Sequence, residues 1–262
     1  MNPTFITTDT ETGGLDPRTA PLLSVAVLIC SDTYEEYDRG WEQKVLPPPK
    51  TLLEWPKEAE QSRDLASWKK EPPELEAYVD VHTLKVVSVE EVEYLKSLED
   101  GPLPFKERLQ RIDEGKCCPL IIQAVAASIN GYGKDSEGNW SLTGSQVWHS
   151  KAIPLDRADE MYVNYLKQAF TAAPIAVTHN SDFDSTYLEY YLPNAFRSIE
   201  SFQCTMKKLR EHYKRTGTNG KASLDTLIKL AGYESEGAHG ALSDARSCLA
   251  GLRWLMRKQH TV

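Results

Sequence analysis

Short apolar runs and helical patterns follow one another along this chain in an order that few folds accommodate. Residues 4–8 (TFITT) and 22–30 (LLSVAVLIC) have the composition of strands, with a Gly/Asp/Pro turn between them. Further on, a helical pattern at 156–170 leads into the apolar run at 174–178 and then into more helices. Strands first and helix–strand–helix alternation afterwards predict an α/β fold, a mixed β-sheet flanked by helices.

Other segments have the patterns of a third N-terminal strand and of further helices. The strand would complete an antiparallel meander with the first two, and the helices would cover the sheet. We expect the strand at 36–45 and the helices at 119–131, 183–192, 204–215, 223–233 and 241–258.

The composition changes between residues 47 and 118, where proline clusters separate short charged stretches. Ser88 and Glu91 have the spacing of a capping box and predict a helix start. No titratable cluster in this segment has catalytic spacing. We therefore expect a single domain over residues 1–262 with a helical insertion at 47–118. Its tryptophans are expected to pack in a core, with contact to a partner as the alternative: Trp55 and Trp68.

The net charge of −8 argues against a protein that coats nucleic acid, because such binding depends on many Lys/Arg–phosphate contacts. It does not exclude an enzyme that binds only the end of a strand. No apolar run approaches the roughly 18 residues of a membrane helix, and no secretory signal is recognisable. The five cysteines form no CxxC pair, so we expect reduced thiols, no membrane and a cytoplasmic protein.

Two carboxylates, Asp9 and Glu11, stand one residue apart at the end of the first predicted strand. Residues i and i+2 of a strand project to the same face, so these two side chains lie together. Like charges so close repel each other unless a cation lies between them, and Mg²⁺ prefers carboxylate oxygens. An exposed acid pair on an edge strand is the alternative.

Two later stretches also end predicted elements in polar residues. THNSDFD (178–184) follows a buried strand and places Asp184 at the start of a helix, where an acid is also favourable for the helix itself. HGALSDA (239–245) places His239 after a glycine-rich approach and Asp244 one turn into the last helix. Each spacing alone is a weak signal.

In combination, the order D-x-E, HN-x-x-FD and H-x-x-x-x-D resembles the DEDDh family of 3′–5′ exonucleases, which includes the proofreading subunit of the bacterial replicative polymerase and ribonuclease T. TGGLDP after the first acids and SLDTLIKLAGY before the last motif are further matches. The resemblance covers roughly residues 1–46 and 119–258 and implies a ribonuclease H-like sheet.

The family resemblance also implies a site and a reaction. The reaction is hydrolysis of the terminal phosphodiester at a 3′ end, which releases nucleoside 5′-monophosphates. His239 would be the general base that takes the proton from the attacking water. Two divalent cations, Mg²⁺ or Mn²⁺, would be held by four carboxylates: Asp9, Glu11, Asp184 and Asp244.

Substrate contacts are implied around these motifs. Thr12, Gly14 and Leu15 match the positions that receive the terminal nucleotide, and Asn180 is a further candidate contact. The segment 206–221 carries six Lys/Arg against one Glu, where a strand could pass. Its candidate phosphate contacts are Lys207, Lys208 and Arg210, and a solvated helix face is the alternative.

The chain departs from the family in two places. The 47–118 segment widens the spacing between the first two motifs, and Cys204–Thr205 stands where many members have Asp–Thr. Three functions follow: a deoxyribonuclease favouring single-stranded ends and serving replication or repair, an exoribonuclease trimming RNA 3′ ends, and a proofreading subunit that binds a polymerase through 47–118. The sequence does not separate DNA from RNA, because nothing in it is seen to read the 2′-hydroxyl.

Overall fold

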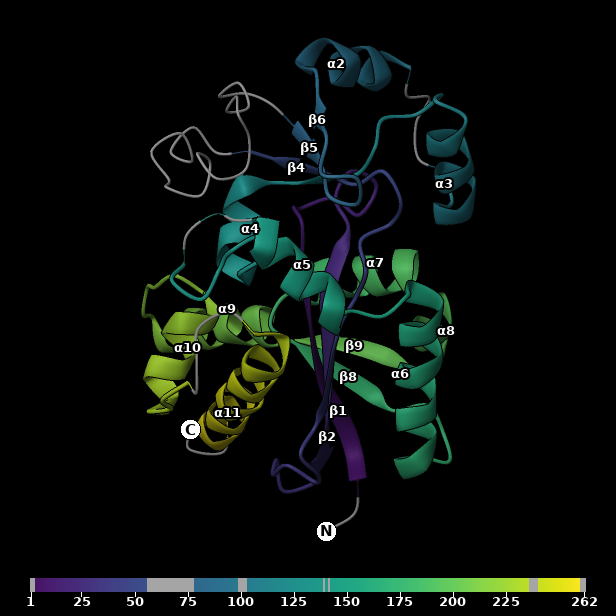
Figure 1. Ribbon diagram of the computed structural model, residues 1–262. Helices are drawn as coiled ribbons and strands as arrows, with labels where there is room; N and C mark the ends of the chain where they lie inside the picture. The colour runs from purple at the N-terminus through teal and green to yellow at the C-terminus, as the bar shows by residue number, and fades with distance from the viewer. Residues whose placement is uncertain are drawn as a thin grey trace. The chain divides into compact units, whose positions relative to one another are not determined.

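The computed structural model describes residues 3–55, 78–98, 103–138, 140, 142–235 and 240–259 (Figure 1). The chain divides into two compact units. The first comprises residues 1–11, 24–43 and 155–262, and the second comprises 12–23 and 44–154. No helix within the described residues combines the length and hydrophobicity needed to cross a bilayer.

A five-stranded sheet organises the first unit, in the order β3-β2-β1-β8-β9. The central strand β1 pairs in parallel with β8, and β8 pairs in parallel with β9, so these three strands end at the same edge. The strands are β1 (Pro3–Thr12), β2 (Leu22–Ser31), β3 (Trp41–Lys44), β8 (Ile175–Thr178) and β9 (Ser201–Cys204). The predicted strand at 36–45 is therefore shorter than expected, because Gly40 adopts a positive φ of 75° just before β3.

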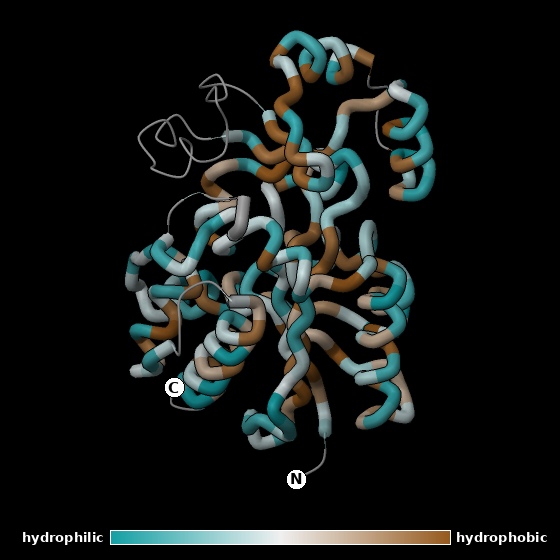
Figure 2. Tube along the Cα trace, in the orientation of Figure 1, coloured by the Kyte–Doolittle hydropathy of each residue, from teal (hydrophilic) through white to brown (hydrophobic). Residues whose placement is uncertain are grey.

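Helices cover both faces of this sheet. On one face Phe5 and Val177 pack against Cys248 and Leu252 of α11 (Ala241–Gln259). Figure 2 shows hydrophilic and hydrophobic residues alternating along α11, as expected for a helix with one buried side. On the other face Tyr162 of α6 (Leu155–Ala169) donates a 3.0 Å hydrogen bond to Thr8 Oγ1.

The remaining helices of the first unit follow the parallel strands. They are α7 (Ser181–Tyr191), α8 (Pro193–Arg197), α9 (Thr205–Thr216) and α10 (Leu224–Ala231). The predicted α/β sheet flanked by helices is confirmed.

The second unit contains a four-stranded sheet in the order β6-β5-β4-β7. Strand β4 pairs antiparallel with β5 and parallel with β7, so this sheet is mixed. Its strands are β4 (Leu52–Glu54), β5 (Tyr78–Asp80), β6 (Val86–Val87) and β7 (Ile121–Ile122), and its helices are α2 (Val89–Ser97), α3 (Phe105–Asp113), α4 (Ala124–Asn130) and α5 (Leu142–Lys151).

The segment 47–118 is thus not wholly helical, because three of these short strands lie in its described part. Strands of two or three residues are too short to show an alternating pattern, which is why the sequence did not reveal them. The predicted helix start is confirmed, since Ser88 Oγ accepts a 3.1 Å hydrogen bond from the Glu91 N–H at the start of α2. Trp55 lies in the core of this unit, as expected, and Trp68 lies outside the described residues. The insertion boundaries stay a prediction.

Candidate active site

Three carboxylates meet at the end of β1. Asp9 and Glu11 project from the same face of the strand, two residues apart, and Asp244 lies in the first turn of α11. One oxygen from each of the three lies within 4.8 Å of the others, and all three side chains are half-buried. Residues 9 and 244 are far apart along the chain, so this convergence is produced by the packing of α11 on the sheet.

The fourth predicted carboxylate, Asp184, lies in the first turn of α7, directly after β8. Because β1 and β8 are parallel neighbours, the start of α7 lies at the same sheet edge as the end of β1. The Thr10 N–H and Oγ1 both donate to Asp184 Oδ1, at 3.1 and 2.8 Å, which fixes this buried carboxylate against the strand. The structure therefore brings all four predicted acids to one region of the first unit.

The pKa values of Asp9, Glu11 and Asp184 are raised, because the carboxylates of this region are buried close together. Burial, followed by the charges of Asp184, Glu11 and Asp244, holds the pKa of Asp9 well above its ordinary value. Burial and the neighbouring acids raise the pKa of Glu11 to about 8. Burial raises the pKa of Asp184 to about 6, an increase that its hydrogen bonds from Thr10 partly offset. Protons or bound cations relieve such repulsion, and the latter keep the carboxylates ionised.

An oxygen-only donor set of this kind fits hard divalent cations such as Mg²⁺ or Mn²⁺. The group Asp9, Glu11 and Asp244 offers one ligand oxygen each within a span that a single ion could bridge. The buried carboxylate of Asp184 adds negative charge beside them, which favours a second cation.

Two neighbours of the acids did not stand out from the sequence. Thr10 points to the opposite side of β1 from Asp9 and Glu11, and its role as a donor to Asp184 appears only once α7 is in place. Glu42 on β3 adds a further negative charge that raises the pKa values of Asp9 and Glu11. Only the pairing order of the strands, which places β3 in the same sheet, could have revealed Glu42.

Other predicted residues fall in different surroundings. His239 lies outside the described residues, so its role as general base stays a prediction. Asn180 is exposed at the start of α7 and its side chain makes no capping hydrogen bond there. Cys204 caps α9, because its Sγ accepts from the Lys207 N–H at 3.4 Å.

The predicted nucleotide-receiving residues belong to the second unit, immediately after Glu11 in the sequence. Thr12 Oγ1 donates a 2.6 Å hydrogen bond to the Gly14 carbonyl, which shapes the loop that follows β1. A side chain at Gly14 would place its Cβ only 2.9 Å from that of Ala20, so the close packing of this loop requires glycine. Leu15 is 83% exposed, so its side chain is available for contact with a ligand.

The basic residues of α9 do not act as one group. Lys207 forms a 2.8 Å ion pair with Asp182, at the start of α7. Arg210 is exposed, whereas Lys208 is half-buried. The two lysines, adjacent in sequence, therefore point to different surroundings.

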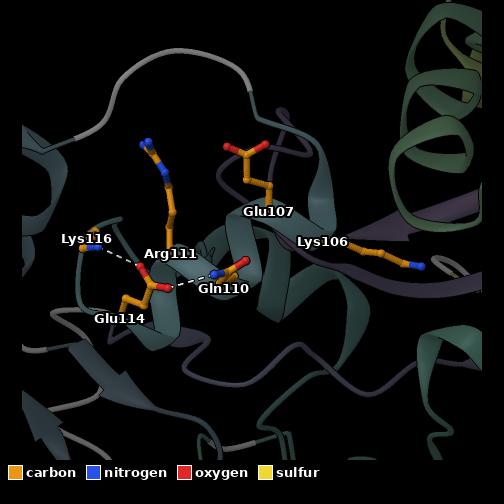
Figure 3. Close-up of a pocket in the computed structure, with 6 residues that line it drawn as sticks. All are labelled: Lys106, Glu107, Gln110, Arg111, Glu114 and Lys116. Carbon is orange, nitrogen blue, oxygen red and sulfur yellow. Dashed lines mark hydrogen bonds and ion pairs between the residues drawn. The ribbon is translucent and has the colours of Figure 1, made fainter.

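A hollow over α3 in the second unit is lined by charged side chains of both signs (Figure 3). Glu114 pairs there with Lys116 at 2.9 Å and accepts a hydrogen bond from Gln110 at 2.9 Å. This partial self-neutralisation leaves no convergent set of catalytic groups, so we do not place the active site there.

The chain matches no family model and no curated protein. Among solved structures it is similar to E. coli exonuclease I. The fold is ribonuclease H-like. The form with bound zinc and single-stranded DNA has a TM-score of 0.53 at 13% identity, covering 100% of this chain and 42% of that one. The complex with a dT13 oligonucleotide has a TM-score of 0.56 at 13% identity, covering 99% and 42%.

A third similar structure is exonuclease I with SSB-Ct, which has a TM-score of 0.54 at 12% identity and covers 99% of this chain and 42% of that one. The present chain thus spans less than half the length of these relatives. At this low identity the structural similarity shows a common fold alone, and the activity has to be argued from the residues themselves.

Proposed function

We propose that this protein is a metal-dependent 3′–5′ exonuclease that releases nucleoside 5′-monophosphates from DNA, with single-stranded ends favoured. The observation that carries the proposal is the convergence of Asp9, Glu11 and Asp244 within 4.8 Å, beside a buried Asp184 that Thr10 fixes in place. A common fold with a protein solved in complex with single-stranded oligonucleotides supports the choice of substrate.

The roles of the residues follow from their chemistry. Asp9, Glu11, Asp184 and Asp244 would hold two divalent cations, Mg²⁺ or Mn²⁺, which when bound supply positive charge to the phosphate under attack. His239 would accept the proton of the attacking water. Thr12, Gly14, Leu15 and Asn180 would receive the terminal nucleotide, and Lys207, Lys208 and Arg210 would contact phosphates. The carboxylates must be deprotonated to do this, so binding of the cations would displace protons from Glu11 and Asp9.

A test uses oligonucleotides of DNA and RNA, single- and double-stranded, labelled at the 3′ or 5′ end, with Mg²⁺, Mn²⁺ or EDTA. We expect stepwise shortening from the 3′ end, which EDTA stops and which Asp9→Ala or Asp184→Asn abolishes. Glu189→Gln is the matched control, because Glu189 is an exposed acid on the same helix as Asp184. Full activity of Asp184→Asn would refute the assignment.

The same assay separates the alternatives. Shortening of RNA alone would identify an exoribonuclease. Absence of hydrolysis with every metal, together with retained binding of a polymerase, would identify a binding subunit that uses residues 47–118.

A further inference from the structure

Helix α9 presents basic side chains in two directions. Lys207 and Arg210 are three residues apart and share one face, on which Lys207 pairs with Asp182. Lys208, His212 and Arg215 recur with spacings of four and three residues and share another face. This second face lines a cavity of about 170 Å³ together with Leu255 and Gln259 of α11, and the acidic Glu211 lines it as well. We call it the α9–α11 groove.

The walls of the groove are held together by packing. Leu209 of α9, Leu227 of α10 and Leu255 of α11 form one buried cluster beneath it. The ring of His212 lies edge-on to Trp254, with ring centroids 5.0 Å apart. The side chains above this cluster are therefore carried on a rigid base.

Positive charge accumulates along the groove. Arg215 Nη2 donates to the Lys258 carbonyl at 3.1 Å and lies 3.5 Å from His212 Nδ1, so it stands near the end of α11. Burial, and then the charges of Arg215 and Lys258, lower the pKa of His212. Arg215 also satisfies a helix-terminal carbonyl, which explains its position in structural terms. That explanation does not extend to Lys208, which forms no ion pair with any residue that the structure describes.

The α9–α11 groove starts near the sheet edge where the carboxylates meet. Helix α9 begins at the end of β9, on the sheet edge where the acids meet, and Lys207 pairs with Asp182 of α7 there. Lys208 lies in the first turn, and Arg215 lies seven residues on, about 10 Å along the helix axis. A chain of phosphates that followed Lys208 to Arg215 would lead away from the site.

We infer that the α9–α11 groove binds the sugar–phosphate backbone of a single strand several nucleotides from the 3′ end that is hydrolysed. This inference rests on the proposed function. The groove carries Lys208 and Arg215 with the ring of His212 between them, and positively charged grooves are the means by which proteins follow the backbone of a single strand without reading its sequence.

The test measures binding in EDTA, so that no hydrolysis occurs, using 5′-fluorescent oligothymidylates of about 4 and about 16 nucleotides. Lys208→Ala/Arg215→Ala should weaken binding of the longer strand about tenfold and that of the shorter one much less. The slope of log K against log salt for the longer strand should fall by about 1.4, because each contact to a single strand contributes about 0.7.

The control variant is Lys167→Ala/Lys229→Ala, which removes two exposed positive charges from α6 and α10 and should leave the length dependence unchanged. Should the loss of Arg215 disturb folding, as shown by circular dichroism, Lys208→Glu alone is the substitute, because Lys208 has no ion pair to lose within the described residues. An unchanged affinity ratio between long and short strands in a folded groove variant would overturn the inference.

Failure of the proposed function would look different. If wild-type protein hydrolyses nothing with Mg²⁺ or Mn²⁺ yet shows the length dependence that the groove variant loses, the exonuclease proposal fails and the groove is supported. If the wild type hydrolyses 3′ ends and the groove variant keeps the length dependence, the exonuclease proposal is supported and the groove inference fails.

Discussion

Asp9→Asn should stabilise the metal-free protein and at the same time remove its stabilisation by Mg²⁺. The change is nearly isosteric and removes one ionisable carboxyl group from a cluster whose oxygens lie within 4.8 Å of one another. At that distance and an effective dielectric constant of about 20, two unit charges repel by about 3.5 kcal/mol. The pKa of Glu11, raised to about 8, means that a proton already relieves part of this repulsion at pH 7.

We therefore expect a gain of about 2 kcal/mol in the unfolding free energy of the metal-free variant. For a chain of this size that corresponds to a rise of about 4–8 °C in Tm. In wild-type protein, Mg²⁺ at one hundred times its Kd should add about 2.7 kcal/mol, and the variant should lose most of this increment. The sign of the effect thus reverses between EDTA and Mg²⁺.

Differential scanning calorimetry in EDTA and in a Mg²⁺ series measures both quantities. Glu189→Gln makes the same change of charge on an exposed side chain, and its free energy of unfolding should stay within about 0.5 kcal/mol of the wild-type value, as for other surface substitutions. A metal-free Asp9→Asn protein less stable than wild type, with an unchanged response to Mg²⁺, would refute the reasoning.

Three further predictions concern the same unit. Thr10→Val removes a 2.8 Å hydrogen bond to the Asp184 carboxylate, an interaction worth about 1.5–3 kcal/mol. The Mg²⁺ concentration that gives half of the maximal thermal stabilisation should therefore rise about tenfold, and an unchanged midpoint would contradict this. Burial and neighbouring acids raise the pKa of Glu11 from 4.5 to about 8, so between these pH values the folded metal-free protein binds a proton that the unfolded chain releases. The contribution of Glu11 to stability is therefore complete below about pH 4.5 and is lost as the pH rises to about 8. Denaturation in EDTA at a series of pH values checks this, and the same decline in saturating Mg²⁺ would count against it. Gly251→Ala places a Cβ 2.4 Å from Leu227 Cγ. The cost of overpacking, about 1–3 kcal/mol, should exceed the gain in helix propensity of about 1 kcal/mol and lower the Tm. A higher Tm would show that α10 moves aside without cost.

Local chemistry alone determined much of this protein. Alternation on β1 directs Asp9 and Glu11 to one face, and the cap at Ser88 and the apolar pattern of α11 are readable without any tertiary information. These features depend on neighbours within a few residues, and such interactions are encoded by spacing.

Tertiary structure decided which distant groups meet. The parallel pairing of β1 with β8 brings Asp184 to Thr10, 174 residues away in the sequence, and the strand order brings the charge of Glu42 toward the acids. Tertiary packing also decided what the two lysines meet: Lys207 pairs with Asp182 of α7, whereas Lys208 lies beside Leu255 and Gln259 of α11. The short strands of the second unit could not be predicted from the sequence either, because segments of two or three residues become strands only through the partners that hydrogen-bond to them. Contacts of this kind depend on pairing between segments remote in the chain, and the physical reason that they escape prediction is that no single segment carries that information.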